Sequence, residues 1–572
     1  MAPAFHSDRL DVAVVGGGVS GLYTAWRLLT AAREQCRELN VTVFERSDRV
    51  GGRLLTWLPQ GPEGGLRAEL GGMRFLKDQE LLCGLLSEMG FAQQDYLRFY
   101  VQGGKSPRQE KLRLLLRGKS TRLNDPRRTD RYGLPRKERG KDAGELIEAV
   151  IKEVVTGEDN AQWLKGGFPT TREAWDIVKP HLKRGDRRLW DIGFWDLLFE
   201  LRDAETYQYM TDAFGYYSLA SNWNAAEAMQ FISLDFTAPS SNGEPEYWTL
   251  RQGFEALPEA LAEKVEALGG KILTETRLVS FEAPRGDDVR ATFTCPHATF
   301  QVEAGSLVLG LPRRSLELLA PSRDFDLQGD DRLRRLVESV LPIPAFKFFL
   351  FYAERWWEDL GIDRGRSVCD LPIRQTYYLG PDALYEEDPE KPVPPWGLLM
   401  ASYGDARSVD FWQGMVPPRQ QRKQGRVELR EKMAELVREL KDWKESSIPE
   451  PPPELNKATP EMILQAREQL ALLHAKKLKE IPEPSLAAFA DWGFDPYGGG
   501  WNFWQPQVDV RDTMTAVKAP LGEDRRVYVA GESYSGCQGW VEGALTTAEL
   551  VLQRYFDLQR PEWLPQEYYL GW

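Results

Sequence analysis

A glycine-rich turn between a short apolar strand and a helix constrains this chain of 572 residues more than any other feature. Residues 10–15 (LDVAVV) have the pattern of a buried strand, and Gly16-Gly17-Gly18-Val19-Ser20-Gly21 follows at once. The apolar spacing of residues 22–39 predicts a helix, and the apolar residues 41–44 predict a second strand that ends at Glu45. This order of elements is typical of a dinucleotide-binding α/β unit.

Each glycine of the turn has its own task in such a unit. Gly16 allows the tight turn, Gly18 lets a pyrophosphate approach the backbone, and Gly21 lets the helix pack on the strand. The free N–H groups and the dipole at the start of the helix favour an anion there. Glu45 places a carboxylate where a ribose diol would be held. The sequence therefore predicts an α/β protein with a Rossmann-like domain.

Length and charge narrow the class of protein further. At ~150 residues per domain the length suggests two to four domains. The chain carries 86 acidic and 73 basic residues, a net charge of −13, and such a surface repels phosphate backbones, so we expect no nucleic acid partner. The nearly uncharged residues 12–26 are too short to span a bilayer, and no positively charged segment with an apolar core precedes them. We expect a cytoplasmic protein without a membrane anchor.

Cysteine and histidine usage predicts neither a disulfide framework nor a metal site. The five cysteines and four histidines are spread along the chain without short ligand spacings such as CxxC or HExxH. This usage fits a reducing compartment. Tryptophan is frequent, with 19 residues, which is consistent either with a large core or with a pocket for a flat molecule.

Beyond the glycine turn, the chain alternates between regular and irregular regions. The basic, glycine-rich residues 103–142 are interpreted as loops. Residues 407–480 are interpreted as a surface insertion, a solvated helical hairpin or, alternatively, a contact for a partner or a second copy. Periodicity predicts helices over residues 143–156, 190–201, 210–231, 254–268, 427–444 and 461–479, and strands over 271–281, 306–311 and 527–530.

Two further motifs carry a resemblance to a known family. After Glu45-Arg46 comes Gly51-Gly52-Arg53-Leu54, and near the other end Gly531-Glu532 follows a strand and precedes Gly539-Trp540-Val541-Glu542-Gly543-Ala544. The sequence resembles the flavin-dependent amine oxidase family, which implies FAD as the cofactor. The cofactor-binding residues implied by this resemblance are Gly16, Gly18, Gly21, Glu45, Arg46, Gly52, Arg53, Gly72, Met73, Leu278, Gly531, Glu532, Trp540 and Val541.

The segment Gly71-Gly72-Met73-Arg74 is similar to that of the L-amino acid oxidase branch, in which the arginine grips the substrate α-carboxylate. A guanidinium suits this task because its planar fork of donors matches a carboxylate and keeps its charge. The resemblance implies that Lys347 holds a water beside flavin N5 and that Tyr403 helps to bind the carboxylate. It further implies that the Gly539 carbonyl accepts from the substrate amine and that the Trp540 ring walls the site. Spacing adds Trp501 as a residue of the side-chain pocket.

Two departures from the family pattern bear on mechanism. Residues 215–224 contain no histidine, whereas some members carry a proposed base there, so any mechanism that needs it is in doubt. Residues 497–504 contain no cysteine, so we expect FAD to be bound non-covalently. Cys537, beside the flavin motif, is interpreted as a small buried thiol.

The function implied is oxidation of an L-amino acid to a 2-oxo acid, ammonia and H2O2, by hydride transfer to FAD and reoxidation by O2. Alternatives are an L-amino acid 2-monooxygenase, which releases an amide, a non-catalytic flavoprotein and a monoamine or polyamine oxidase. Trp501, Trp504, Trp540 and Trp223 favour large apolar or aromatic side chains. Asp235 as an anchor for a basic side chain, and glutamine as a substrate, stay open. Related enzymes are often dimers or larger.

The resemblance also implies a division into domains. We expect a discontinuous FAD-binding domain from residues 8–72, 249–340 and 510–560. A mixed-sheet substrate domain would comprise residues 73–139, 236–248 and 341–509, including the insertion. Residues 140–235 would form a helical lobe that lines the entrance.

Overall fold

The computed structural model describes residues 9–58, 66–99, 111–236, 246–379, 395–439 and 451–572. One sheet has the strand order β12-β2-β1-β15-β14-β13, with β24 paired to β15. The pairs β12–β2, β2–β1, β1–β15 and β15–β24 are parallel, and β15–β14–β13 form an antiparallel meander. The strands are β1 (Leu10–Val15), β2 (Val41–Phe44), β12 (Lys271–Leu273), β13 (Arg277–Glu282), β14 (Val289–Cys295), β15 (Ala298–Leu309) and β24 (Val527–Val529).

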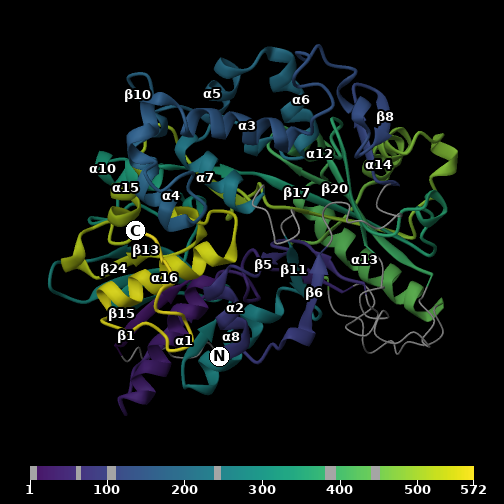
Figure 1. Cartoon of the computed structure of the whole chain (residues 1–572). Helices are drawn as coiled ribbons and strands as arrows, with labels where there is room; N and C mark the ends of the chain where they lie inside the picture. Colours follow the sequence, from purple (N-terminus) through teal and green to yellow (C-terminus); the bar gives the residue numbers. More distant parts are fainter. Residues whose placement is uncertain (1–8, 59–65, 100–110, 237–245, 380–394, 440–450) are drawn as a thin grey trace.

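Both faces of the central strand β1 are buried, which explains its nearly uninterrupted apolar sequence. Val12 and Val14 belong to the core beneath the helices, and Ala13 and Val15 belong to the core on the other face. On the first face α1 (Val19–Glu34) packs against α8 (Ala256–Ala267) and α16 (Val541–Tyr555), so helices far apart in the sequence lie side by side there (Figure 1).

The predicted strand over residues 271–281 is interrupted. Glu275 has a left-handed backbone (φ 51°), and its N–H donates to the Ser47 carbonyl while that of Thr276 donates to the Glu45 carbonyl. The two resulting strands, β12 and β13, therefore lie at different places in the sheet. The predicted first helix starts at Val19, directly after the N-cap Gly18, and ends at Glu34.

A second, eight-stranded sheet has the order β21-β22-β17-β20-β19-β18-β7-β8 and is antiparallel except for β18–β7. Its last two strands, β7 and the edge strand β8, lie where loops were predicted, so that interpretation was wrong for residues 113–122. Residues 100–110 lie outside the described residues. The strands are β7 (Arg113–Leu116), β8 (Lys119–Arg122), β17 (Ala345–Tyr352), β18 (Gly365–Cys369), β19 (Gln375–Leu379), β20 (Gly397–Asp405), β21 (Asn456–Lys457) and β22 (Leu486–Asp491).

The structure also contains four smaller sheets among the described residues. One of them has the order β5-β11-β6, and β16 pairs with β23, β3 with β4 and β9 with β10. Their bounds are β3 (Thr56–Trp57), β4 (Ala68–Glu69), β5 (Phe75–Leu76), β6 (Tyr96–Phe99), β9 (Lys183–Arg184), β10 (Arg187–Arg188), β11 (Tyr247–Leu250), β16 (Val340–Ile343) and β23 (Trp501–Trp504).

Helices of residues 143–235 form a lobe with its own apolar core (Figure 1). The helix predicted over residues 210–231 is two helices, because Gly215 ends the first with φ 99° and the Asn224 side chain caps the second. The lobe contains α3 (Ala143–Val155), α4 (Arg172–Val178), α5 (Phe194–Leu201), α6 (Ala204–Phe214) and α7 (Ala225–Asp235).

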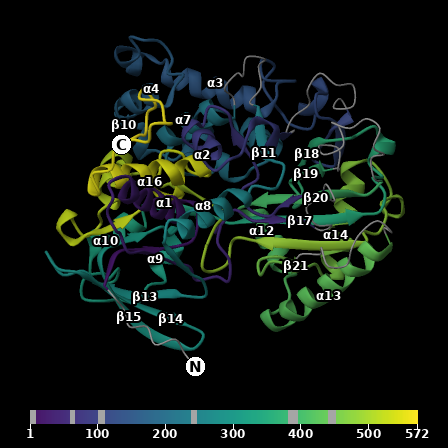
Figure 2. The same cartoon turned by 90° about the horizontal axis from the view of Figure 1, so that it is seen from below.

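The insertion at residues 407–480 is not a solvated hairpin. Leu429 and Met433 of α13 (Arg419–Glu439) are buried in the core of the second sheet, and α14 (Pro460–Leu473) buries Met462 and Leu470 there. Figure 2 shows α13 and α14 along this sheet. The apolar residues of these charged helices thus lie against the sheet. The remaining helices with described ends are α2 (Glu80–Glu88), α9 (Arg313–Glu317), α10 (Asp331–Val337), α12 (Arg407–Gln413) and α15 (Val510–Val517).

The expected domain segments are distributed as follows. Residues from all three expected FAD-binding segments contribute to the seven-stranded sheet, and residues 341–509 supply most strands of the second sheet. Helix α2 falls in the expected substrate domain but packs in the core of the first sheet, through Leu81 and Leu85, against α16. Among the described helices none has both the length and the apolarity that crossing a lipid bilayer requires.

Candidate active site

A cavity of about 980 Å³ opens at the carboxyl ends of β1, β2 and β15. Ligands of open α/β sheets bind at this edge. Gly18 faces the cavity, and a Cβ added to it would meet nothing within 4 Å, so its backbone is open to a ligand. Gly16 has φ 105°, and a Cβ there would lie 2.5 Å from the Gly310 carbonyl oxygen. The first turn of α1 therefore presents bare backbone to the cavity, as a pyrophosphate requires.

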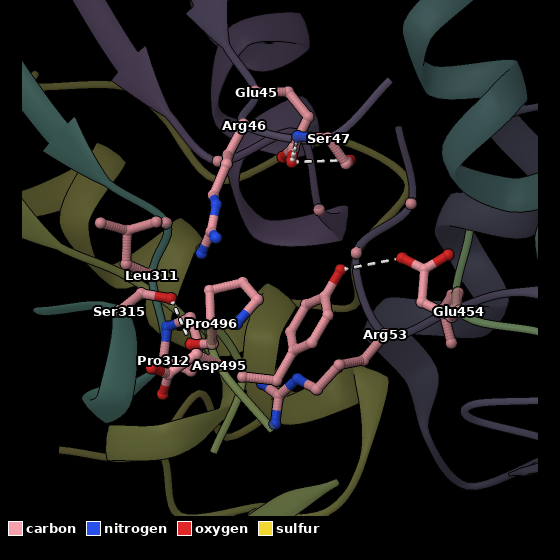
Figure 3. A pocket seen from close by; sticks show the side chains of 18 of the residues that line it. Glu45, Arg46, Ser47, Arg53, Leu311, Pro312, Ser315, Glu454, Asp495 and Pro496 are labelled. Atoms are coloured by element: carbon pink, nitrogen blue, oxygen red, sulfur yellow. Dashed lines mark hydrogen bonds between the residues drawn. The ribbon is translucent and has the colours of Figure 1, made fainter. Parts of the chain in front are cut away.

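Glu45 is fixed at the rim of the cavity. Its Oε2 accepts from Gly17 N at 2.6 Å, and its Oε1 accepts from the backbone and side chain of Ser47 at 2.7 and 2.8 Å. Figure 3 shows Glu45 beside Ser47, with the Arg46 side chain extending towards the centre of the cavity. The carboxylate is thus oriented where the motif predicts a ribose contact.

The C-terminal motif closes the other end of the cavity. Glu532 accepts from Gly539 N at 2.8 Å and from Asn502 N at 3.0 Å, and it forms a 2.9 Å ion pair with Arg53. Arg53 also donates to the Gly500 carbonyl at 3.1 Å. Glu532 thereby joins the two predicted cofactor motifs to β23, although they are almost 480 residues apart in sequence.

Of the predicted cofactor-binding residues, all but two line this cavity. Gly21 does not, because it packs against the turn: a Cβ there would lie 2.0 Å from the Gly16 carbonyl oxygen. Met73 does not either, because its side chain is buried in the core of the second sheet. The residues that line it are Gly16, Gly18, Glu45, Arg46, Gly52, Arg53, Gly72, Leu278, Gly531, Glu532, Trp540 and Val541.

Sequence reasoning missed several parts of the cavity wall, including Asp491 and residues 493–496. Gly310, Leu311 and Pro312 line it because they follow β15, which pairs with β1 in parallel, so both carboxyl ends meet at one edge. The buried strand and the glycine after it were visible in the sequence. Another part comes from the insertion, where Arg422 and Glu454 line the opposite wall and Glu454 accepts from Tyr497 at 3.3 Å (Figure 3). No local sequence pattern indicated that Arg422 and Glu454 would lie at this cavity.

The predicted carboxylate anchor, Arg74, is buried against the Tyr247 ring. Its Cζ lies 4.1 Å from the centre of that ring, which is stacked with the Trp540 ring at a centroid distance of 6.3 Å. Its Nη1 donates to the Tyr377 hydroxyl at 3.4 Å. In the described part of the chain no carboxylate forms an ion pair with Arg74, which is 8% exposed. A buried guanidinium without a counter-ion is a site for an anionic ligand group.

Aromatic side chains surround Arg74. The rings of Tyr216 and Tyr403 lie edge to face with centroids 5.5 Å apart. Trp501 contacts both, with centroid distances of 6.2 and 6.5 Å, and its Cβ would lie 3.9 Å from a Cβ built on Gly539. The structure thus brings Arg74, Tyr403, Trp501, Gly539 and Trp540 together into what we call the aromatic chamber, which includes Tyr216, Tyr247 and Tyr377.

Lys347 lies between the chamber and the cavity. Its Nζ donates to the carbonyls of Glu69 at 2.8 Å and Gly71 at 2.6 Å and lies 4.8 Å from the centre of the Tyr403 ring. Burial lowers the pKa of Lys347 and raises that of the Glu69 carboxyl, each to about 7. An ammonium has three donors, so one N–H is left for a water or a ligand.

Three residues considered for the side-chain pocket have other roles. Asp235 accepts from Trp540 Nε1 at 3.0 Å, so it holds the ring of the chamber wall and is not directed at a basic substrate. Trp223 stacks on Phe503 at 3.9 Å, and Trp504 donates to the Ser535 carbonyl at 3.0 Å, both within cores. Only Trp501 and Trp540 of the predicted tryptophans lie in the chamber described here.

Comparison with known proteins gives a consistent result. The family described as flavin containing amine oxidoreductase matches residues 19–462. Aplysianin-A of Aplysia kurodai is 25% identical over 96% of this chain and 90% of its own length. L-amino acid oxidase Bs29 of Bothriechis schlegelii is 21% identical over 94% of this chain and 88% of its own. A solved structure of putrescine oxidase bound to putrescine, 17% identical, superimposes with a TM-score of 0.61 and covers 96% of this chain and 100% of its own, which shows a shared fold.

Proposed function

Because the chain belongs to the flavin-containing amine oxidoreductases, we propose that it is an FAD-dependent L-amino acid oxidase. The observation that carries the proposal is Arg74, a buried guanidinium without an ion-pair partner among the described residues, in an aromatic chamber next to the cavity. A simple amine has no acid group to meet this cation, whereas an α-amino acid has one. Relatives that are named L-amino acid oxidases support the same assignment.

FAD fits the cavity on several grounds. The cavity has a volume of about 980 Å³, which is within the range of cofactor sites. The bare backbone at Gly16 and Gly18 suits the pyrophosphate, and Glu45 suits the ribose of the adenosine half. The end expected for the flavin ring is lined by Gly531, Glu532, Gly539, Trp540 and Val541. No cysteine or histidine is among the residues found to line the cavity, which supports non-covalent binding.

The residues of the chamber would orient the substrate. Arg74 would hold the α-carboxylate in two parallel hydrogen bonds, with the Tyr403 hydroxyl as a further donor. The carbonyl of Gly539 would accept from the neutral amine, and Trp501 and Trp540 would flank the Cα. The protein's contribution is mainly this alignment of the Cα–H with the cofactor, since the bound flavin supplies the acceptor for the hydride and passes its electrons to O2.

Proton transfer needs no strong base in this arrangement. If the amine enters neutral, loss of the hydride gives the imino acid, which water hydrolyses to a 2-oxo acid and ammonia. The two electrons and two protons end in H2O2. Lys347, whose ammonium has one N–H left beyond its two bonds to backbone carbonyls, would hold a water at the junction of the chamber and the cavity.

Anaerobic mixing of the yellow holoenzyme with each L-amino acid tests the proposal. We expect the flavin absorbance band to bleach and, after O2 is admitted, equal amounts of 2-oxo acid, ammonia and H2O2. Formation of an amide and CO2 instead would identify the monooxygenase alternative. Failure of every L-amino acid to bleach the band would refute the proposed oxidase.

A further inference from the structure

The aromatic chamber is bordered by a second buried guanidinium, that of Arg366 on β18. Arg366 is 7% exposed, and in the part of the chain that the structure describes neither it nor Arg74 forms an ion pair with a carboxylate. Burying a charge without a partner is costly, so two such cations near one ligand site need an explanation. One substrate α-carboxylate can neutralise only one of them.

A chain of hydrogen bonds links the two cations. Arg74 Nη1 donates to the Tyr377 hydroxyl at 3.4 Å, this hydroxyl donates to Gln375 Oε1 at 3.2 Å, and Arg366 Nη1 donates to the same oxygen at 2.9 Å. The two Nη1 atoms are therefore no more than about 10 Å apart. Register explains the grouping: Gln375 pairs with Tyr403 across β19 and β20, and Arg366 pairs with Tyr377 across β18 and β19.

Two donors in this group have no partner. Arg366 Nε and Gln375 Nε2 are both buried and make no hydrogen bond within the described residues. Gln375 is 0% exposed, and its oxygen is already engaged by two donors, so its amide N–H groups remain for an acceptor. An unpaired buried donor is destabilising, and a ligand oxygen that accepted from it would remove that cost.

We propose that the oxidase prefers an acidic substrate, L-aspartate or L-glutamate, whose side-chain carboxylate is held by Arg366 and Gln375 while Arg74 holds the α-carboxylate. The proposal rests on the oxidase function above. The two carboxylate carbons of extended glutamate are about 5 Å apart, so the molecule is long enough to reach between two guanidinium groups whose Nη1 atoms are at most about 10 Å apart.

This assignment differs from the expectation of a large apolar or aromatic side chain. The aromatic rings of the chamber are compatible with that expectation, but Tyr216, Tyr377 and Tyr403 also bring hydroxyl groups. The polar pair Arg366 and Gln375 was not visible in the sequence. An apolar side chain would leave both donors buried without a partner. A glutamine side chain would offer an acceptor but no charge for Arg366.

Isosteric substrates provide the test. With the wild-type holoenzyme, kcat/KM for anaerobic flavin reduction by L-glutamate should exceed that for L-glutamine and L-methionine by at least about 100-fold. Arg366→Gln should lose at least that factor with L-glutamate and change little with L-methionine, whereas a merely structural role would lower both equally. Arg366→Lys, which keeps the charge, should recover part of the loss. Exposed Arg335→Gln on α10 is the matched control.

A second measurement covers the case in which Arg366→Gln does not fold. Glutarate and pentanoate differ only in one terminal carboxylate, and binding of either perturbs the flavin spectrum of the wild-type enzyme. We expect glutarate to bind at least about 10-fold more tightly. Equal binding, or wild-type preference for L-leucine or L-phenylalanine over L-glutamate, would overturn the proposal. If no L-amino acid reduces the flavin, the oxidase function itself fails, and the acidic preference fails with it.

Discussion

Replacing Arg74 with glutamine perturbs the proposed grip on the substrate carboxylate directly. Arg74 is 8% exposed, and its Cζ lies 4.1 Å from the centre of the Tyr247 ring. Its Nη1 donates a hydrogen bond to the Tyr377 hydroxyl. It can therefore offer its free N–H groups to a carboxylate as two parallel bonds. Removing one partner of such a buried pair costs about 2–5 kcal/mol. This corresponds to a fall in kcat/KM of about 30- to 5000-fold.

The assay is anaerobic stopped-flow reduction of the flavin over a range of substrate concentrations. The loss should be mainly in substrate binding, because Arg74 holds a group that does not react. Flavin content should be unchanged, since Arg74 does not line the cofactor cavity in the described structure. Arg335→Gln serves as the control. Unchanged kcat/KM in Arg74→Gln, or loss of the flavin with it, would refute the reasoning.

Other parts of the site give further predictions. Gly16→Val should yield colourless protein, because a Cβ at φ 105° would lie 2.5 Å from the Gly310 carbonyl oxygen. The control Gly166→Ala, whose added Cβ would have no neighbour within 4 Å, should stay yellow. A yellow Gly16→Val protein would contradict the role of this turn in binding the cofactor. Lys347→Met should bind FAD but slow flavin reduction or reoxidation in stopped-flow experiments, and unaltered rates of both would exclude Lys347 from the mechanism. Burial raises the pKa of Asp235 from 3.8 to about 7, so the folded state binds the extra proton and stability falls as pH rises through this window. Asp235→Asn removes that titration and keeps an acceptor for Trp540. The melting temperature of the variant minus that of the wild type should therefore increase between about pH 5 and about pH 8. A difference that does not change with pH would contradict the raised pKa of Asp235.

The parts of the site that the sequence predicted are those built from contiguous residues. Gly16, Gly18 and Glu45 follow from one strand–turn–helix–strand unit, whose local geometry is set by neighbouring residues. The same holds for Gly531 and Glu532 after β24. Arg74, Lys347 and Tyr403 required the family resemblance, because only the fold brings these distant residues to the chamber and its border.

What the sequence did not predict depends on strand pairing and long-range packing. Arg366 and Gln375 look unremarkable in sequence, and only the register of β18, β19 and β20 places them behind Tyr403. The charged insertion was interpreted as solvated because its apolar residues are sparse. Leu429 and Met433 nevertheless anchor α13 to the second sheet, which brings Arg422 to the cavity wall. The left-handed turn at Glu275 has no glycine to signal it.

The central claim is that a buried arginine selects an amino acid by its carboxylate and presents it to a flavin. The most direct measurement is anaerobic flavin bleaching by each L-amino acid and by the amine that lacks only its carboxylate. The account predicts rapid bleaching by at least one L-amino acid and none by its decarboxylated amine at the same concentration. Bleaching by the amine at an equal or greater rate would contradict it.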